Sequence, residues 1–273
     1  MIWASLATGF ALAAAIAFVA HRMGSLTIGG ALAATVVGGL TFGVGGVLPG
    51  ALLLLFFVSS SVLSRLGRRR KGALAAQFEK SSRRDHWQVI ANGAVAAALA
   101  VVYGSTTDLR ALAALAGALA AVNADTWATE VGVLARRRPW RLTDGRRVDP
   151  GTSGAVTVEG TLAALAGATL VGLTAGSAMG SSLLTAVAIA GGLAGATADS
   201  LIGATIQAMF FCPACNKETE RHPLHSCGTP TVRLRGWPWL RNDGVNLGAS
   251  LIGAAVAAAV YIVWGGLTEA GVS

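Results

Sequence analysis

Long apolar runs alternate with short polar connections along the whole chain. Several of these runs hold about 18 or more residues with few charges, which is the length that a helix needs to cross the hydrocarbon core of a bilayer. This pattern predicts an all-α, polytopic membrane protein with about eight transmembrane helices in one transmembrane domain over residues 1–273. The predicted spans are residues 2–20, 26–42, 47–66, 87–103, 109–135, 154–175, 183–211 and 245–265.

The composition supports a membrane protein. Hydrophobic residues make up 53% of the 273 positions and charged residues only 12%, whereas soluble proteins carry about 25% charged residues. Glycine is abundant, with 36 residues, and small residues line the interfaces where membrane helices pack closely. The first apolar run has no basic segment before it, so we interpret it as a retained helix rather than a signal peptide.

The positive charges predict how the spans are oriented. Of the 21 Lys and Arg residues, 20 lie in the connections after the first, third, fifth and seventh spans, and Arg110 is the exception. Because positively charged loops stay in the cytoplasm, we expect cytoplasmic loops at about residues 65–86, 136–153 and 212–241 and both termini outside. The net charge of +8 then reflects topology and contact with anionic membrane lipids. No nucleic-acid-binding motif is present, so nucleic acid is not an expected partner.

Polar side chains gather at the predicted cytoplasmic boundary of the membrane. A carboxylate inside a span is costly unless it is paired, hydrated or bound to a metal. Single members of this group also have structural interpretations, because an Asp can link neighbouring helices and the helix dipole stabilises an acid near a helix N-terminus. We favour a shared site, since structural roles would have to hold in five segments at once. The residues are Asn92, Asn123, Asp125, Glu130, Glu159, Asp199, Asn242, Asp243 and Asn246.

The two acids of the fifth span cannot both occupy one face of a regular helix. At about 100° per residue, Asn123 and Glu130 share a face, whereas Asp125 and Glu130 lie about 140° apart. Either the helix is locally irregular, or the two acids serve adjacent parts of one site. Glu130 also partly compensates the arginines that follow it.

The sequence GTSG at residues 151–154 leads directly into the sixth predicted span. Small residues before a helix expose backbone N–H groups, and the helix dipole adds positive potential, so the pattern favours an anion such as phosphate. A Gly/Ser loop that only turns the chain is an equal alternative. Carboxylates beside a phosphate imply a bridging Mg²⁺, because bare acids repel phosphate. The residues therefore indicate phosphate chemistry at the cytoplasmic surface.

All three cysteines lie in one predicted cytoplasmic loop, in the stretch CPACNKETERHPLHSCGTPT. An odd number of cysteines in a reducing compartment argues against disulfides. Cys212, Cys215, His225 and Cys227 match a tetrahedral Zn²⁺ set, and four protein ligands would make that zinc structural. The alternatives are three free thiols or, with less support, redox chemistry at the CxxC.

The motifs RRDHWQVIANG, NADTWATEVG, GTSGAVTVEGT, ADSLIGATIQ and WLRNDGVNL, in this order, resemble a family of integral membrane proteins. That family includes the plant phytyl-phosphate kinases of the vitamin E pathway and many prokaryotic proteins of unknown function. The resemblance covers essentially the whole chain. It implies transfer of a phosphoryl group from a nucleoside triphosphate, CTP by analogy with phytol and dolichol kinases, to an isoprenoid monophosphate in the membrane.

The resemblance also implies roles for individual residues. Asp125, Glu130 and Asp199 would bind Mg²⁺, and Asp243 would be a further ligand or an orienting acid. Arg83 and Arg84 would neutralise phosphate. Phosphate oxygens or ribose would contact a set comprising Asn92, Asn123, Thr152, Ser153, Gly154, Glu159, Asn242 and Asn246. Phosphoryl transfer needs mainly positioning and charge neutralisation, so such a site requires no strong base.

Two other functions remain open at this point. A cytidylyltransferase would use Mg²⁺, CTP and a lipid phosphate as well, but would release pyrophosphate and a CDP-lipid. A transporter of a phosphorylated or ionic solute would also use intramembrane carboxylates, but it would place polar residues near the midplane. A lipid-packing scaffold would leave the carboxylates unexplained. The composition favours a prokaryotic inner membrane, with the active site on the cytoplasmic side.

Overall fold

The computed structural model describes residues 2–66 and 83–270. Most of the predicted cytoplasmic loop at residues 65–86, namely residues 67–82, lies outside the described residues. Seven helices in the described segments are long and apolar enough to cross a membrane, and α2 is a shorter apolar helix. The helices are α1 (Ile2–Arg22), α2 (Ile28–Gly43), α3 (Val47–Arg65), α5 (His86–Thr106), α6 (Leu109–Gly132), α7 (Val158–Met179), α8 (Ser182–Thr205) and α9 (Asn242–Ala270). The prediction of a polytopic helical membrane protein is confirmed. Its second span is short because α2 rises only about 24 Å, less than the thickness of a hydrocarbon core.

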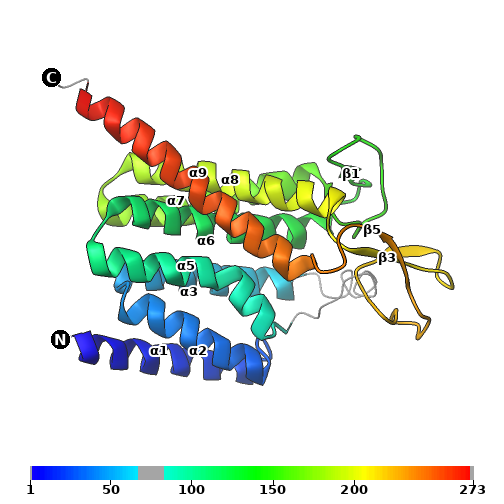
Figure 1. Ribbon diagram of the computed structural model, residues 1–273, viewed down its shortest axis with the longest axis horizontal. Coiled ribbons are helices and arrows are strands. Elements are labelled where there is room, and N and C mark those ends of the chain that lie inside the picture. Colours follow the sequence, from blue (N-terminus) through cyan, green and yellow to red (C-terminus); the bar gives the residue numbers. More distant parts are fainter. Residues whose placement is uncertain (1, 67–82, 271–273) are drawn as a thin grey trace.

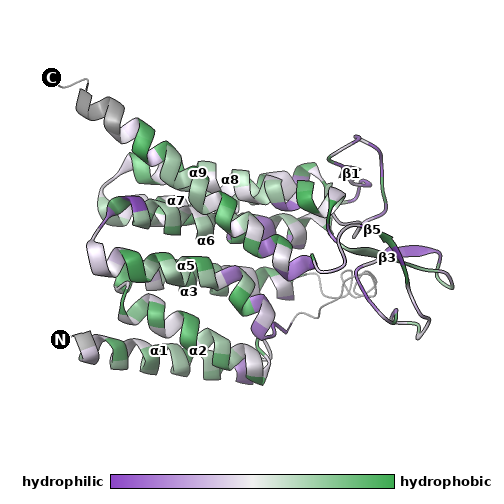
Figure 2. Ribbon diagram, in the orientation of Figure 1, coloured by the Kyte–Doolittle hydropathy of each residue, from purple (hydrophilic) through white to green (hydrophobic). Residues whose placement is uncertain are grey.

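The helices form a bundle with two distinct ends (Figure 1). Both termini lie at one end, which we call the terminal end. All the strands and the connections after α6 and α8 lie at the opposite end, which we call the strand end. Hydrophilic residues concentrate at the strand end, whereas apolar residues dominate the helices (Figure 2). Both termini therefore lie at the same end of the bundle (Figure 1), and their orientation toward the outside stays a prediction.

Helix α6 is the centre of the bundle. It packs against α3, α5, α7, α8 and α9. Of the 18 residues in its most apolar stretch, 78% are buried inside the protein. Leu112, Leu115 and Leu119 on three successive turns have no exposed surface. Because other helices surround α6, polar side chains on its strand-end half lie between helices rather than in lipid.

Glycines allow α6, α8 and α9 to approach each other closely. A Cβ atom on Gly253 of α9 would lie 2.8 Å from the carbonyl oxygen of Gly117 and 3.0 Å from that of Gly191. Such distances leave no room for a methyl group without backbone movement. The packing resembles the small-residue interfaces on which membrane helices depend.

Replacing Gly253 with alanine is expected to destabilise the bundle by about 1–3 kcal/mol through overpacking. Gly248→Ala on the same helix is a matched control, since the nearest atom to its added Cβ is 3.8 Å away. Both changes give the same gain in helix propensity, so thermal unfolding in detergent isolates the packing effect. Equal melting temperatures for the two variants would show that the close contact is unimportant.

Small β-sheets in the connections add to the predicted all-helical spans. Strands β1 (Trp140–Arg141) and β2 (Ala155–Val156) pair with each other, and β3 (Met209–Cys212) lies between β4 (Lys217–Thr219) and β5 (Val232–Arg235). The prediction that the seventh span continues to residue 211 is wrong, because α8 ends at Thr205 and the apolar residues that follow form β3. A short apolar run does not by itself distinguish a strand from the end of a helix.

Candidate functional site

Three acidic side chains from distant parts of the chain converge at the strand end. The carboxyl groups of Asp125 on α6 and Asp199 on α8 lie within hydrogen-bonding reach of each other. Glu220, which follows β4, is close enough to interact electrostatically with Asp199. We call Asp125, Asp199 and Glu220 the acid cluster. The predicted partnership of Asp125 with Asp199 thus has a geometric basis in the structure.

The acid cluster has the chemistry of a divalent-cation site. The carboxylates of Asp125 and Asp199 repel each other, and the charge of Glu220 adds to the repulsion at Asp199. Among the described residues, only the Cys/His loop brings three or more possible ligand atoms into one compact group, so the acid cluster is an adjacent pair with a third acid near it. The Oδ2 atom of Asp199 is buried and accepts no hydrogen bond, although buried polar atoms are nearly always satisfied. Mg²⁺ is bound through carboxylate oxygens and waters, so a bound cation would satisfy both the charge and the open oxygen.

A chain of hydrogen bonds connects Glu220 to the GTSG loop. The Nε2 atom of Gln207 donates to Glu220 Oε1 over 2.9 Å, and Ser153 Oγ donates to Gln207 Oε1 over 2.7 Å. The loop itself packs on α8, because a Cβ atom on Gly154 would lie only 2.4 Å from the carbonyl oxygen of Ser200. Gly154 also has a positive φ of 74°. Ser153 and Gly154 therefore support the acid cluster from the side of α8.

The prediction that GTSG leads directly into a helix is wrong. Helix α7 begins at Val158 after β2, and its N-cap is Thr157, whose hydroxyl accepts a hydrogen bond from Gly160 N. The dipole of α7 therefore does not act directly on residues 151–154. Thr152 Oγ donates to the carbonyl oxygen of Asp149 within the loop. Glu159 is exposed in the first turn of α7, where the helix dipole favours a carboxylate.

The structure assigns Asn123 a different role from the predicted contact with nucleotide. Its side chain is completely buried. Nδ2 donates to the carbonyl oxygen of Gly167 over 2.9 Å, and Oδ1 accepts from Ser59 Oγ over 2.9 Å. Asn123 thus links α3, α6 and α7 two residues before Asp125, and its side chain is fully buried among them.

A second group of polar side chains lies on the opposite side of α6. Arg84 donates from its guanidinium to Ser60 Oγ over 2.8 Å and lies over the rings of Phe56 and Phe57. Glu130 accepts a hydrogen bond from Ser64 Oγ and interacts electrostatically with Arg84. We call Arg84, Ser60, Ser64 and Glu130 the arginine cluster. Asp125 and Glu130 therefore have different partners, as their angular separation on the helix predicts.

Arg84 is held in an environment that favours an additional negative charge. Desolvation lowers the pKa of its guanidinium to about 10, and Glu130 only partly offsets that effect. The backbone is fixed from both sides, because Arg84 N donates to the carbonyl oxygen of Ser25 and Arg84 O accepts from Thr27 N, each over 3.0 Å. The turn between α1 and α2 thus positions this cation at the start of α5.

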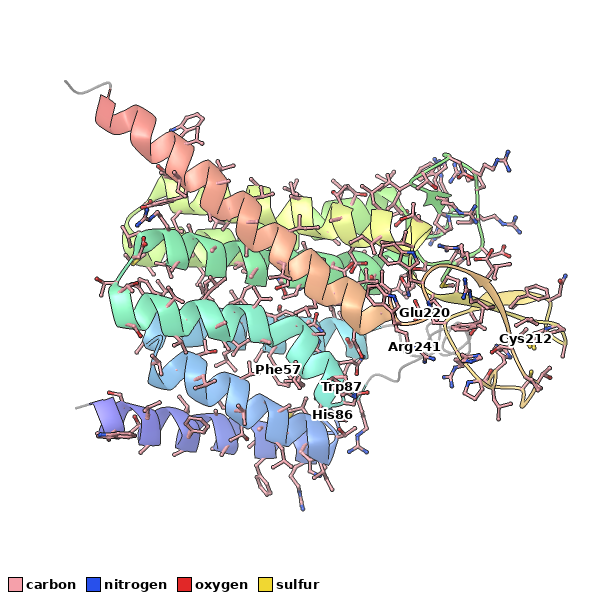
Figure 3. All side chains as sticks on the ribbon, viewed as in Figure 1. Phe57, His86, Trp87, Cys212, Glu220 and Arg241 are labelled. Atoms are coloured by element: carbon pink, nitrogen blue, oxygen red, sulfur yellow. The ribbon has the colours of Figure 1, made fainter. Side chains whose placement is uncertain are left out.

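The other predicted residues lie around these clusters. Arg83 donates to the carbonyl oxygen of Leu26 over 3.2 Å, and Asn92 donates to that of Gln88 over 2.8 Å. Asn242, Asp243 and Asn246 are half-buried in the first turns of α9 at the strand end. Figure 3 places Glu220 and Arg241 close to the start of α9, and Cys212 farther out in the loop.

The Cys/His loop forms a compact set of possible metal ligands. One ligand atom from each of Cys212, Cys215, His225 and Cys227 lies within 4.8 Å of the others. Hydrogen bonds with Thr229 and His225 lower the pKa of Cys227 to about 5, whereas a hydrogen bond with Cys227, burial and the neighbouring Cys212 raise the pKa of Cys215 to about 11. Three sulfurs and one imidazole nitrogen so arranged fit tetrahedral Zn²⁺, and the same loop carries Glu220 to the acid cluster.

Comparison with known proteins adds the family. The profile of the family "Integral membrane protein DUF92" matches residues 11–254. This chain belongs to that family. "Protein PGR" of Arabidopsis thaliana is 32% identical to the chain, and the aligned region covers 90% of the chain and 93% of that protein.

Two prokaryotic relatives bear the name of uncharacterized membrane proteins. The one from Methanocaldococcus jannaschii is 30% identical, over 77% of the chain and 75% of its own length. The one from Synechocystis is also 30% identical, over 76% of the chain and 70% of its own length. No solved structure matches the chain. The predicted resemblance to an integral membrane family with plant and prokaryotic members is confirmed.

Glu220 is the member of the acid cluster that sequence reasoning missed. It lies outside the DUF92 helices, in a loop that the sequence marks only as a zinc-binding segment. Its position depends on the β3–β4 hairpin, in which Cys212 pairs with Lys217 and Phe210 with Thr219. The sequence offered one signal for Glu220. It is an acidic residue directly after the β3–β4 hairpin, which follows α8, the helix that carries Asp199.

Proposed function

We propose that this DUF92 protein is a membrane-embedded kinase that transfers a phosphoryl group from a nucleoside triphosphate, CTP by family resemblance, to an isoprenoid monophosphate. The observation that carries the proposal is that Asp125, Asp199 and Glu220 interact with each other at the strand end of a membrane bundle. The half-buried Arg84 lies across α6 from them at the same end. We propose that the active site lies on the cytoplasmic side of a prokaryotic inner membrane, which the distribution of Lys and Arg along the sequence supports.

Within this proposal the acid cluster binds Mg²⁺, which when bound neutralises and aligns the nucleotide phosphates. Arg84 would bind the phosphate of the lipid, whose oxygen is the nucleophile. That oxygen forms the new P–O bond while the bond to the β-phosphate breaks, and the nucleoside diphosphate leaves. A phosphate nucleophile is already ionised, so the reaction needs positioning more than a base. Asn242, Asp243 and Asn246 then contact nucleotide from the start of α9.

The test uses purified protein in nanodiscs with Mg²⁺, CTP labelled at the γ-phosphate, and geranylgeranyl monophosphate. The proposed reaction transfers label to the lipid and gives the lipid diphosphate with CDP. Labelled pyrophosphate together with a CDP-lipid would instead identify a cytidylyltransferase. Folded protein that turns over none of the nucleoside triphosphates would contradict an enzymatic function and favour a transporter.

Zinc in the Cys/His loop is proposed to be structural and to hold Glu220 in place. Purified protein is expected to contain about one zinc per chain, because the four ligands leave no open coordination position. Cys212→Ser should remove the zinc and lower turnover by about tenfold, the size of effect typical of losing support around a metal site. Metal analysis and the transfer assay measure both, with Cys212→Ser compared against Ser226→Ala in the same loop. Full activity in zinc-free protein would contradict the coupling.

A further inference from the structure

An elongated apolar cavity opens between α1, α2, α3 and α5, on the same side of the bundle as the arginine cluster. The cavity is partly open to its surroundings, so its empty space of about 660 Å³ includes open solvent. Its walls are built from small and apolar residues, among them Ala13, Ala17, Gly38 and Phe57. On α1 and α2 the lining residues extend over about two helical turns, so the cavity runs along the bundle rather than across it.

The two ends of the cavity differ in chemistry. Arg84, Gln88 and Asn92 line its strand end and provide a cation and two amides. Phe42 lines the other end, and its ring packs directly on the backbone of α3, since a Cβ atom on Gly50 would lie 2.1 Å from it. Gln88 and Asn92 use side-chain atoms in local hydrogen bonds, since Gln88 Oε1 accepts from Asp85 N and Asn92 Nδ2 donates to the carbonyl oxygen of Gln88. Arg84 is therefore the cation at the strand end of an otherwise apolar cavity.

Close contact between α1 and α2 limits the width of the cavity. A Cβ atom on Gly9 would lie 2.5 Å from Gly43 Cα, and one on Gly39 would lie 2.6 Å from the ring of Phe10. These helices therefore meet without a gap toward the terminal end. We call the free space beside them the slot.

We infer that this cavity binds the single hydrocarbon chain of a lipid monophosphate, with its phosphate at Arg84 and its chain directed toward Phe42. Charge complementarity selects the occupant, because Arg84 donates to Ser60 and favours an anion at the mouth, while the remaining wall is apolar. The inference deepens the proposed function and rests on it for the reaction, since it places the acceptor lipid on the Glu130 side of α6 and the nucleotide on the Asp125 side.

The position of the slot predicts how the two substrates meet. Asp125 and Glu130 are separated by five residues of α6, or about 7.5 Å along its axis. A phosphate held at Arg84 thus lies across the end of α6 from a metal held by the acid cluster. Lipid enters from the membrane and nucleotide from the water, so neither has to pass the other.

Binding is tested without nucleotide or Mg²⁺, so that no turnover is needed. The probe is tritiated geranylgeranyl monophosphate, added to the full chain in nanodiscs. Ala17→Phe fills the slot and should weaken binding by about tenfold or more. Ala15→Phe is the matched control, because Ala15 is exposed on the same helix and should change binding by less than about twofold. Equal effects of the two substitutions would overturn the assignment.

Two further experiments use the unmodified chain, so their results do not depend on whether a variant folds. A benzophenone-bearing prenyl monophosphate, photolysed with the unmodified chain, should label peptides of α1, α2, α3 or α5. Labelling confined to α7, α8 or α9 would overturn the proposal. Unlabelled phosphatidic acid, with two chains, should compete poorly, and equal competition would refute the single-chain slot. A chain that binds the probe in the slot but never transfers phosphate would sink the proposed kinase and leave the slot standing.

Discussion

Asp125→Asn and Asp199→Asn are each expected to reduce phosphoryl transfer by about 1,000-fold, equivalent to about 4 kcal/mol of transition-state stabilisation. Both substitutions keep the size of the side chain and remove a charged ligand from the acid cluster. Asp108→Asn is the matched control. Asp108 is the N-cap of α6, the helix that carries Asp125, and lies at the terminal end; asparagine caps helices as well as aspartate does. The measurement is kcat in the transfer assay at saturating Mg²⁺.

Asp125→Asn and Asp199→Asn should lower activity but raise the stability of the metal-free protein. Removing one of three mutually repelling carboxylates relieves repulsion whenever the metal is absent. Asp199→Asn should therefore raise the melting temperature in EDTA by about 2 °C or more and abolish the further rise that Mg²⁺ gives to the unmodified protein. A variant that loses activity and also melts lower in EDTA would indicate that Asp199 supports the fold rather than a metal.

Arg84→Gln is expected to lower kcat/KM for the lipid monophosphate by about 10- to 100-fold, the loss expected when a charged hydrogen-bond donor to phosphate is removed. Arg84 lies at the cavity mouth, where its guanidinium donates to Ser60 Oγ. It is the only cation among the described residues that line the cavity, so no other positive charge there replaces it. Affinity for the nucleotide should stay the same, because the acid cluster lies on the other side of α6. Steady-state kinetics with each substrate varied in turn separates the two affinities.

The control for Arg84 is Arg136→Gln, which removes one positive charge from an exposed position just after α6. If net positive charge at the membrane surface were what attracts the lipid phosphate, both variants would lose the same activity. A loss confined to nucleotide affinity in Arg84→Gln would contradict the assignment of the arginine cluster to the lipid.

The membrane architecture could be predicted from the sequence because it depends on features that are additive along the chain. Run length sets the spans, and the Lys and Arg distribution places both termini on one side of the bundle, as Figure 1 shows. Errors occur where local patterns are ambiguous. The apolar Met209–Phe211 stretch continues the hydropathy of α8 but pairs as a strand, and the hydroxyl of Thr157, not the GTSG loop, caps α7.

The candidate site was only partly predictable, because contacts between helices depend on rotation and not on depth alone. Hydropathy places Asp125 and Asp199 at a similar depth, and the structure adds that they face each other. The angular separation on α6 predicted either a local irregularity or adjacent parts of one site, and in the structure Asp125 and Glu130 have different partners. Asn123 looked identical to a ligand-binding amide in sequence, yet it links three helices. Glu220 was out of reach, since a zinc-loop hairpin brings it to α8.

The most direct test of the central claim is whether the acid cluster binds a divalent cation. Mn²⁺ substitutes for Mg²⁺ at oxygen ligands and is followed by electron paramagnetic resonance as it is titrated into the purified chain. We expect one tight Mn²⁺ site. Its affinity should fall by about tenfold or more in Asp199→Asn and in Glu220→Gln and stay unchanged in Asp108→Asn. The same Mn²⁺ affinity in all four proteins would contradict it.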